Sequence, residues 1–150
     1  MQKTSLPKPI LVYADDDEDD LHLVNDALSP YKNSLAVHLF PSGQEAYDFL
    51  LELEKTGEKP CLIILDMNMP ALSGRTLLPI LRSIPFFNDV PIALFTTSNS
   101  DHDYHFALTH NAGFITKPVT YMQMNLVAEQ LLSHCSRETW DRIKGIDSGR

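Results

Sequence analysis

The chain has 150 residues, of which 43 % are hydrophobic and 21 % charged, and its formal net charge is −8. This length and composition indicate one globular domain with its own core, without the apolar run of about 20 residues that a membrane helix requires. The negative charge and the lack of a basic stripe argue against sequence-independent binding to nucleic acid.

The two cysteines, Cys61 and Cys135, are too few for a disulfide framework and lack the CxxC spacing of metal and redox motifs. The start of the chain, MQKTSLPKP, has no apolar segment of the kind that a secretory signal peptide requires. We therefore expect a cytoplasmic protein in a reducing environment, with Cys61 as a small core residue.

Short apolar runs alternate along the chain with segments of helical periodicity. Continuous apolar runs are typical of parallel strands that are covered on both faces. The predicted strands are 10–14 (ILVYA), 35–40 (LAVHLF), 61–65 (CLIIL), 92–95 (IALF) and 114–116 (FIT).

The segments between these runs repeat apolar residues at the spacing of amphipathic helices. Two capping-box patterns, Ser42 with Glu45 and Thr120 with Gln123, mark helix starts. Pro79 falls inside a predicted helix and is expected to kink it or to loosen its first turns. The predicted helices are 19–28, 42–56, about 73–83, about 101–110 and one that begins after residue 120.

Five strand–helix units in succession predict an α/β fold with a parallel sheet and helices on both faces, because the crossovers are right-handed. In such doubly wound sheets the ligand site lies beyond the carboxyl ends of the strands. The polar residues that follow the strands should therefore meet at one edge. They are Asp15, Asp16, Asp66, Thr96, Thr97 and Lys117.

These residue types suit phosphoryl transfer with Mg²⁺. Carboxylate oxygens are ligands for Mg²⁺, and the cation would offset the repulsion within the six consecutive acids at 15–20. Asp66 follows a buried strand and is the best candidate for a nucleophile that forms an aspartyl phosphate. Lys117 and Thr96 would stabilise the phosphoryl oxygens.

Four motifs in this order resemble those of the receiver domain of bacterial two-component response regulators, the family of the chemotaxis response regulator. The motifs are YADDDEDD, LDMNMPALSG, ALFTTS and FITKP, and the resemblance covers about residues 8–135. It implies a flavodoxin-like sheet of five strands in the order 2-1-3-4-5. We divide the chain into an N-terminal arm (1–7), the receiver domain (8–135) and a C-terminal tail (136–150).

The resemblance implies a metal site around the phosphorylation site, Asp66. Asp16 is then a direct Mg²⁺ ligand, and Asp15 acts through water or as a second ligand. Asp66 itself and the backbone carbonyl of Asn68 complete the ligand set. The remaining acids, 17–20, are interpreted as a solvated helix start.

The resemblance also implies a switch beside this site. Thr96 is the switch hydroxyl and Phe114 occupies the aromatic switch position, while Lys117 is the phosphate-binding cation. Pro118 is expected to follow a cis peptide bond with Lys117.

A receiver of this kind takes its phosphoryl group from a sensor histidine kinase or a phosphotransfer protein and catalyses only its own phosphorylation and dephosphorylation. It signals to a downstream protein, or forms a homodimer, through the face of the fourth helix, fifth strand and fifth helix. That face should include His102, His105, Phe114 and Tyr121. The alternative is a phosphorelay intermediate that passes the phosphate onward.

Two rival functions are weighed against this one. A phosphatase of the haloacid-dehalogenase type needs a second aspartate two residues after the nucleophile, where this chain has Asn68. A receiver fold that only binds a partner would be expected to lose some of the acids, the hydroxyl or the lysine.

The tail after residue 135 is too short for an effector domain, so a stand-alone receiver is expected. Trp140 and Ile143 lie three residues apart and favour a tail that extends or packs on the preceding helix. The competing interpretation is a frayed end.

Overall fold

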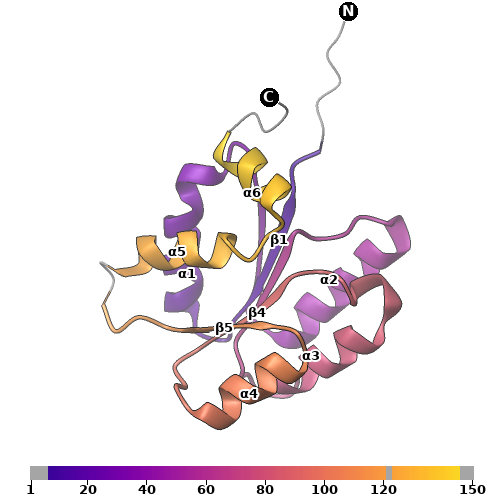
Figure 1. Ribbon diagram of the computed structural model, residues 1–150, viewed down its shortest axis with the longest axis vertical. Helices are drawn as coiled ribbons and strands as arrows, with labels where there is room; N and C mark the ends of the chain where they lie inside the picture. Colours follow the sequence, from indigo (N-terminus) through magenta and orange to yellow (C-terminus); the bar gives the residue numbers. More distant parts are fainter. Residues whose placement is uncertain (1–6, 121–122, 146–150) are drawn as a thin grey trace, which may run out of the picture.

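Five parallel strands form a single sheet in the order β2-β1-β3-β4-β5 in the computed structural model, which describes residues 7–120 and 123–145 (Figure 1). This confirms the predicted fold class and strand order. The strands are β1 (Ile10–Ala14), β2 (Ala36–Phe40), β3 (Leu62–Leu65), β4 (Ile92–Thr96) and β5 (Gly113–Thr116).

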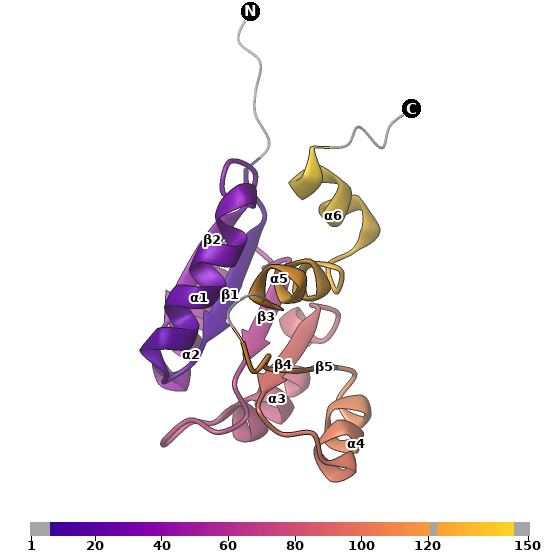
Figure 2. The ribbon, with the colours of Figure 1, turned by 90° about the vertical axis from the view of Figure 1, so that its left-hand side faces the viewer.

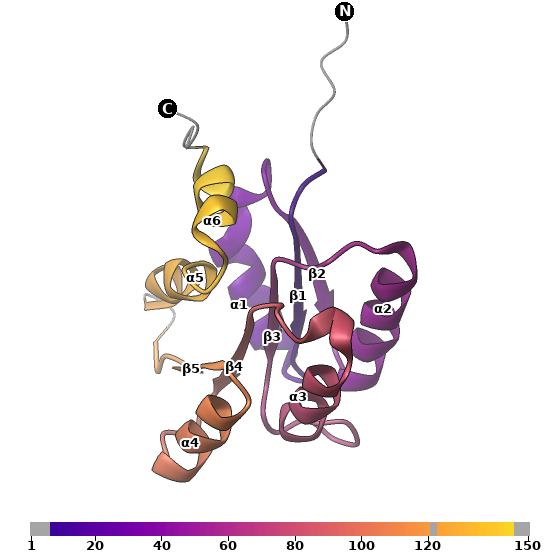
Figure 3. The ribbon, with the colours of Figure 1, turned by 45° about the vertical axis from the view of Figure 1, so that its right-hand side comes forward.

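Helices cover both faces of the sheet, as Figures 1 and 3 show. One layer holds α1 (Glu18–Leu28) and α5 (Met124–Leu132), and the other holds α2 (Gly43–Thr56), α3 (Gly74–Ser83) and α4 (Asp101–Thr109). Two short 3₁₀ helices, η1 (Ser29–Tyr31) and η2 (Pro85–Phe87), follow α1 and α3. In the described part of the chain, no helix is both long enough and apolar enough to cross a membrane.

Alternation along the strands divides the apolar side chains into two cores. Leu11 and Tyr13 of β1 face the core under α1 and α5, whereas Val12 and Ala14 face the core under α2, α3 and α4. Each inner strand is therefore buried on both sides, which explains its continuous apolar sequence.

Of the two capping boxes predicted from the sequence, one is formed at the start of α2 and the other is not formed before α5. Ser42 caps α2 by accepting a hydrogen bond from the Glu45 amide at 3.2 Å, as its capping-box pattern predicts. The predicted box of Thr120 and Gln123 is wrong, because α5 begins at Met124 with Gln123 as an N-cap residue that makes no side-chain capping bond. Only the Thr120 carbonyl is used, as the acceptor of a backbone turn. Helix α3 continues through Pro79 to Ser83.

The C-terminal tail forms a helix of its own, α6 (Arg137–Lys144). The tail does not extend α5, which was one of the two predicted arrangements, because a turn ends α5 and Ser136 then caps a new helix through the Thr139 amide. Ile143 is only 3 % exposed and joins the core under α1 and α5. The described tail is therefore packed, while 146–150, like residues 1–6 of the predicted arm, lie outside the described residues.

Further contacts fix α6 at the edge of the sheet where β1 begins (Figure 2). Trp140 packs on Tyr31 with ring centroids 5.8 Å apart. Ser34 donates a hydrogen bond to the Ile143 carbonyl at 2.7 Å, and Arg142 donates one to the Pro7 carbonyl at 2.9 Å. This edge is the one opposite the carboxyl ends of the strands.

We expect Ile143→Ala to lower the free energy of unfolding by about 2–4 kcal/mol, the usual loss for truncating a buried isoleucine. Guanidinium unfolding followed by circular dichroism measures it. The control is Arg137→Ala, which changes an exposed residue of the same helix and should alter stability by less than about 0.5 kcal/mol. Equal stability of both variants would show that α6 does not contribute to the core.

Candidate functional site

Three carboxylates gather at the carboxyl edge of the sheet. Asp15 and Asp16 follow β1, Asp66 follows β3, and these strands are neighbours with Ala14 opposite Leu65. One oxygen from each carboxylate lies within 4.8 Å of the others. Asp15 is fully buried and Asp66 is 7 % exposed, while Asp16 faces solvent. The sequence prediction that these acids meet at one edge is therefore confirmed.

The backbone fixes Asp66 in this position. Its amide donates to the Ala14 carbonyl at 3.1 Å, and its carbonyl accepts from the Gly74 amide at 2.9 Å. A Cβ at Gly74 would lie 2.3 Å from the Asp66 carbonyl oxygen, so only glycine permits this approach. The Asn68 amide donates to Asp66 Oδ1 at 3.2 Å, which places the Asn68 backbone beside the carboxylate.

The Lys117 ammonium lies among these carboxylates. Its Nζ is 2.7 Å from Asp15 Oδ2, 2.8 Å from Asp20 Oδ2 and 3.3 Å from Asp66 Oδ2. Burial lowers the pKa of Lys117, but the hydrogen bonds to Asp15 and Asp20 and the nearby negative charges raise it above its ordinary value overall. Lys117 therefore stays charged and holds three acids together.

Asp20 belongs to this group, although the sequence analysis placed it in a solvated helix start. It lies in the first turn of α1, where Asp17 caps the helix through the amides of Asp19 and Asp20. An acid in a first turn is ordinary, so no local pattern marks its contact with Lys117. The contact joins the first turn of α1 to the residue that follows β5.

Tyr13 is a second residue that the sequence analysis did not assign to the site. It is fully buried, and its hydroxyl donates to Asp15 Oδ2 at 2.5 Å. Burial, followed by the charge of Asp15, raises the pKa of Tyr13, so the phenol keeps its proton. The sequence pattern that could have indicated this bond is the spacing: side chains two residues apart in a strand lie on the same side, so the Tyr13 hydroxyl can reach Asp15.

Negative charge exceeds positive charge in this cluster. Burial and the charge of Asp15 raise the pKa of Asp66 to about 6, although Lys117 partly opposes the shift. A divalent cation with a preference for oxygen ligands would relieve this excess. The residues present thus fit Mg²⁺, with Asp15, Asp16 and Asp66 as candidate ligands.

Thr96 and Phe114 lie on the two strands next to this cluster. Thr96 is fully buried at the end of β4, its Oγ1 accepts from the Ser98 amide at 3.2 Å, and its carbonyl accepts from the Lys117 amide at 2.7 Å. Phe114 on β5 is partly buried, with its ring edge-to-face with Tyr104 at 6.0 Å. Thr97 is exposed.

The predicted cis peptide bond before Pro118 is wrong, since the described residues contain no cis peptide bond. The trans form is the more stable one for most X–Pro bonds. With it, the Lys117 side chain already reaches its three carboxylates.

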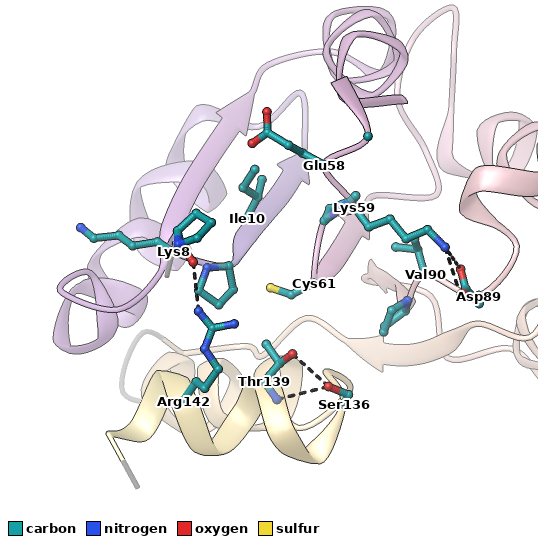
Figure 4. Close-up of a pocket in the computed structure, with 15 residues that line it drawn as sticks. Lys8, Ile10, Glu58, Lys59, Cys61, Asp89, Val90, Ser136, Thr139 and Arg142 are labelled. Carbon is teal, nitrogen blue, oxygen red and sulfur yellow. Dashed lines mark hydrogen bonds and ion pairs between the residues drawn. The ribbon is translucent and has the colours of Figure 1, made fainter. Parts of the chain in front are cut away.

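A separate hollow of about 500 Å³ lies at the opposite edge of the sheet, beside α6 (Figure 4). Its basic side chains are already engaged, because Lys59 pairs with Asp89 at 2.9 Å and Arg142 donates to the Pro7 carbonyl. Cys61 also lines it, and a hydrogen bond with Cys135 together with burial raises the pKa of the Cys61 thiol. A protonated thiol is unreactive, which suits the expected packing role. The acidic edge remains the candidate site.

Comparison with known proteins agrees with this geometry. The family model for the response regulator receiver domain matches residues 10–129. Response regulator Rcp1 of Synechocystis is 28 % identical over 108 residues, which are 69 % of this chain and 71 % of Rcp1.

Solved structures share the fold. The phosphorylated cyanobacterial phytochrome response regulator RcpA superposes with a TM-score of 0.78 at 22 % identity, over 88 % of this chain and 96 % of RcpA. The Mn²⁺-bound form of Rcp1 gives a TM-score of 0.74 at 24 % identity, over 85 % of this chain and 93 % of Rcp1.

The raised pKa of Asp66 predicts a pH-dependent stability. The folded protein holds this proton more tightly than the unfolded chain, whose pKa is near the ordinary 3.8, so the stabilisation is complete below that value and is lost as the pH rises through about 6. In metal-free buffer, Asp66→Asn should therefore melt above wild type at about pH 7.5, with the difference shrinking toward about pH 4.

Thermal melts of both proteins across this range measure the effect. Asp48→Asn removes an exposed carboxylate of α2 and should show no such pH-dependent difference. A constant difference between Asp66→Asn and wild type would contradict the assigned shift.

Proposed function

Because the chain belongs to the response regulator receiver domain family, we propose that Asp66 accepts a phosphoryl group, with Mg²⁺ bound beside it, and that the chain then changes its protein contacts. Receiver domains are generally signalling modules rather than enzymes that act on other substrates. The observation that carries the proposal is the position of Asp66, between the carboxylates that follow β1 and the buried ammonium of Lys117.

The metal site would use oxygen ligands from two neighbouring strand ends. Asp16 and Asp66 would bind Mg²⁺ directly, Asp15 would act through water or as a second ligand, and the Asn68 carbonyl would complete the protein ligands. When bound, the cation neutralises charge on the phosphoryl oxygens and on the acids. Mg²⁺ commonly keeps several waters, which suits a site with few protein ligands.

The side chains around Asp66 position and stabilise the transferred group. An oxygen of the Asp66 carboxylate attacks phosphorus, a P–O bond forms, and the bond from phosphorus to the donor breaks. Lys117, 3.3 Å from Asp66, can contact a phosphoryl oxygen, and the Thr96 hydroxyl can move toward another. The catalysis is therefore mostly positioning and charge compensation.

The phosphoryl donor is expected to be a phosphohistidine of a cytoplasmic sensor histidine kinase or phosphotransfer protein. A phosphatase of the haloacid-dehalogenase type is disfavoured, since the residue two positions after Asp66 is Asn68. An amide side chain cannot serve as the general acid that such a reaction needs.

Exposed apolar side chains lie on α4, on α5 and between β5 and α5, where the output contact is proposed. Among the described residues, the large hydrophobic side chains most exposed to solvent are Tyr104, Leu108, Val119 and Leu126, at 45 %, 53 %, 98 % and 69 %. All four come from α4, α5 or the segment between β5 and α5. The predicted face residues His102 and His105 are also exposed on α4, whereas Tyr121 lies outside the described residues.

Phosphorylation would bias this face through Thr96 and Phe114. Movement of the Thr96 hydroxyl toward the phosphoryl group vacates space, which the partly buried Phe114 ring can fill by turning inward. The ring now contacts Tyr104, so its rotation changes the packing of α4. A downstream protein or a second copy of the chain would bind the changed face.

Acetyl phosphate with Mg²⁺ should add about 80 Da, one phosphoryl group, as measured by intact-mass spectrometry. Asp66→Asn and the addition of EDTA should each abolish the gain, because the nucleophile or the metal is then missing. The control Asp48→Asn keeps both the nucleophile and the metal site, so it should be phosphorylated like wild type. A gain in Asp66→Asn, or one that EDTA leaves unchanged, would assign the site elsewhere.

Beryllium fluoride, a mimic of the bound phosphoryl group, should shift amide NMR signals from Asp66 through Thr96 to α4 and β5. Thr96→Ala should confine the shifts to the loops near Asp66, because the coupling hydroxyl is lost. Sedimentation of the same samples tests homodimerisation, which Leu108→Ser should weaken. Shifts that never reach α4 in wild type would contradict the switch.

A further inference from the structure

We propose that Tyr13 is a positioning residue for Asp15. Its hydroxyl donates a hydrogen bond to the Asp15 oxygen that Lys117 also binds. This bond weakens Asp15 as a metal ligand. It also keeps Asp15 hydrogen-bonded when Lys117 turns to the phosphoryl group. The inference deepens the proposed function and rests on it for the last of these effects. Its basis is the environment of a single buried carboxylate.

Both oxygens of Asp15 accept hydrogen bonds from the protein, and Oδ2 accepts two. Oδ2 accepts from the Tyr13 hydroxyl at 2.5 Å and lies 2.7 Å from Lys117 Nζ, while Oδ1 accepts from the Asp17 amide at 3.0 Å. A carboxylate oxygen has two lone-pair sites, so Oδ2 has none left for a metal ion. Direct coordination by Oδ2 would require one of the two donors to leave.

Tyr13 cannot easily be that donor. Its side chain is fully buried, and its ring lies edge-to-face with Phe95 at 6.1 Å in the core under α1 and α5. Within the described chain, Asp15 is the only hydrogen-bond partner of its hydroxyl. A buried phenol that left this oxygen would lose its partner, at a substantial free-energy cost.

The neighbouring acid is in the opposite situation. Asp16 is exposed, and in the described ranges its side chain makes no hydrogen bond or ion pair. All lone pairs of its carboxylate oxygens are open to a cation. Tyr13 thus divides the two adjacent aspartates into one that is held by the protein and one that is free to bind metal.

The same hydrogen bond matters when Lys117 contacts the phosphoryl group. Asp15 Oδ2 then loses its cationic partner in a fully buried place, where an unpaired carboxylate is unfavourable. The Tyr13 hydroxyl remains on this oxygen and lowers the penalty for the move. Without it, Lys117 should stay on Asp15 more of the time.

The first test is a Mg²⁺ titration of wild type, Tyr13→Phe and Tyr47→Phe, followed by amide NMR without any phosphoryl donor. Tyr13→Phe should bind Mg²⁺ about three- to tenfold more tightly, because one charge-assisted hydrogen bond to Asp15 is removed. Tyr47→Phe removes a hydroxyl on α2, which packs in the other core, and should leave the affinity unchanged. Equal or weaker binding by Tyr13→Phe would overturn the inference.

The second test compares phosphorylation by acetyl phosphate at saturating Mg²⁺. Tyr13→Phe should accumulate phosphate several-fold more slowly than wild type, although it binds the metal more tightly. A merely structural defect would weaken both properties together, and an unchanged rate would overturn the effect on Lys117. Failure of wild type to gain phosphate would instead overturn the proposed function, and the Mg²⁺ titration would still decide the role of Tyr13.

If Tyr13→Phe does not fold, a comparison of two variants that keep Tyr13 tests the same inference. Asp15→Asn should lose less Mg²⁺ affinity than Asp16→Asn, because Tyr13 and Lys117 already occupy Asp15. An equal or larger loss in Asp15→Asn would overturn the inference.

Discussion

A single buried ammonium holds the acidic edge of this protein together. Lys117 lies within 3.3 Å of an oxygen of each of three carboxylates, those of Asp15, Asp20 and Asp66. Asp15 follows β1, Asp20 lies in α1 and Asp66 follows β3, so the ion pairs connect these three elements with the residue that follows β5. Removing this ammonium would be strongly destabilising, because the buried carboxylates would lose their compensation.

The parallel sheet makes this arrangement possible. Strands that run in the same direction deliver their carboxyl ends, and the residues that follow them, to one edge. The two cores under the helix layers are packed with apolar side chains and fix the strands in register. Helix α6 packs at the opposite edge, where Ile143 joins the core under α1 and α5.

The excess of negative charge gives the site its proposed chemistry. Burial and Asp15 raise the pKa of Asp66 to about 6, and a divalent cation or a change in the position of Lys117 alters that balance. In the proposed switch, Thr96 and Phe114 connect the same edge to α4, which carries the exposed side chains of Tyr104 and Leu108. A charge change at Asp66 would then influence a surface that Asp66 does not touch.

The sequence by itself determined the fold class, the strand order implied by the resemblance, and the convergence of Asp15, Asp16, Asp66 and Lys117. These follow from local signals, namely apolar runs, helical spacing and polar residues at strand ends. A single topology accounts for all of these signals. Only the tertiary structure decided that Asp20 and Tyr13 belong to the site and that α6 is a separate helix. Their roles depend on which surfaces meet across the sheet, because an acid in a first helical turn and a tyrosine in a buried strand have ordinary local explanations.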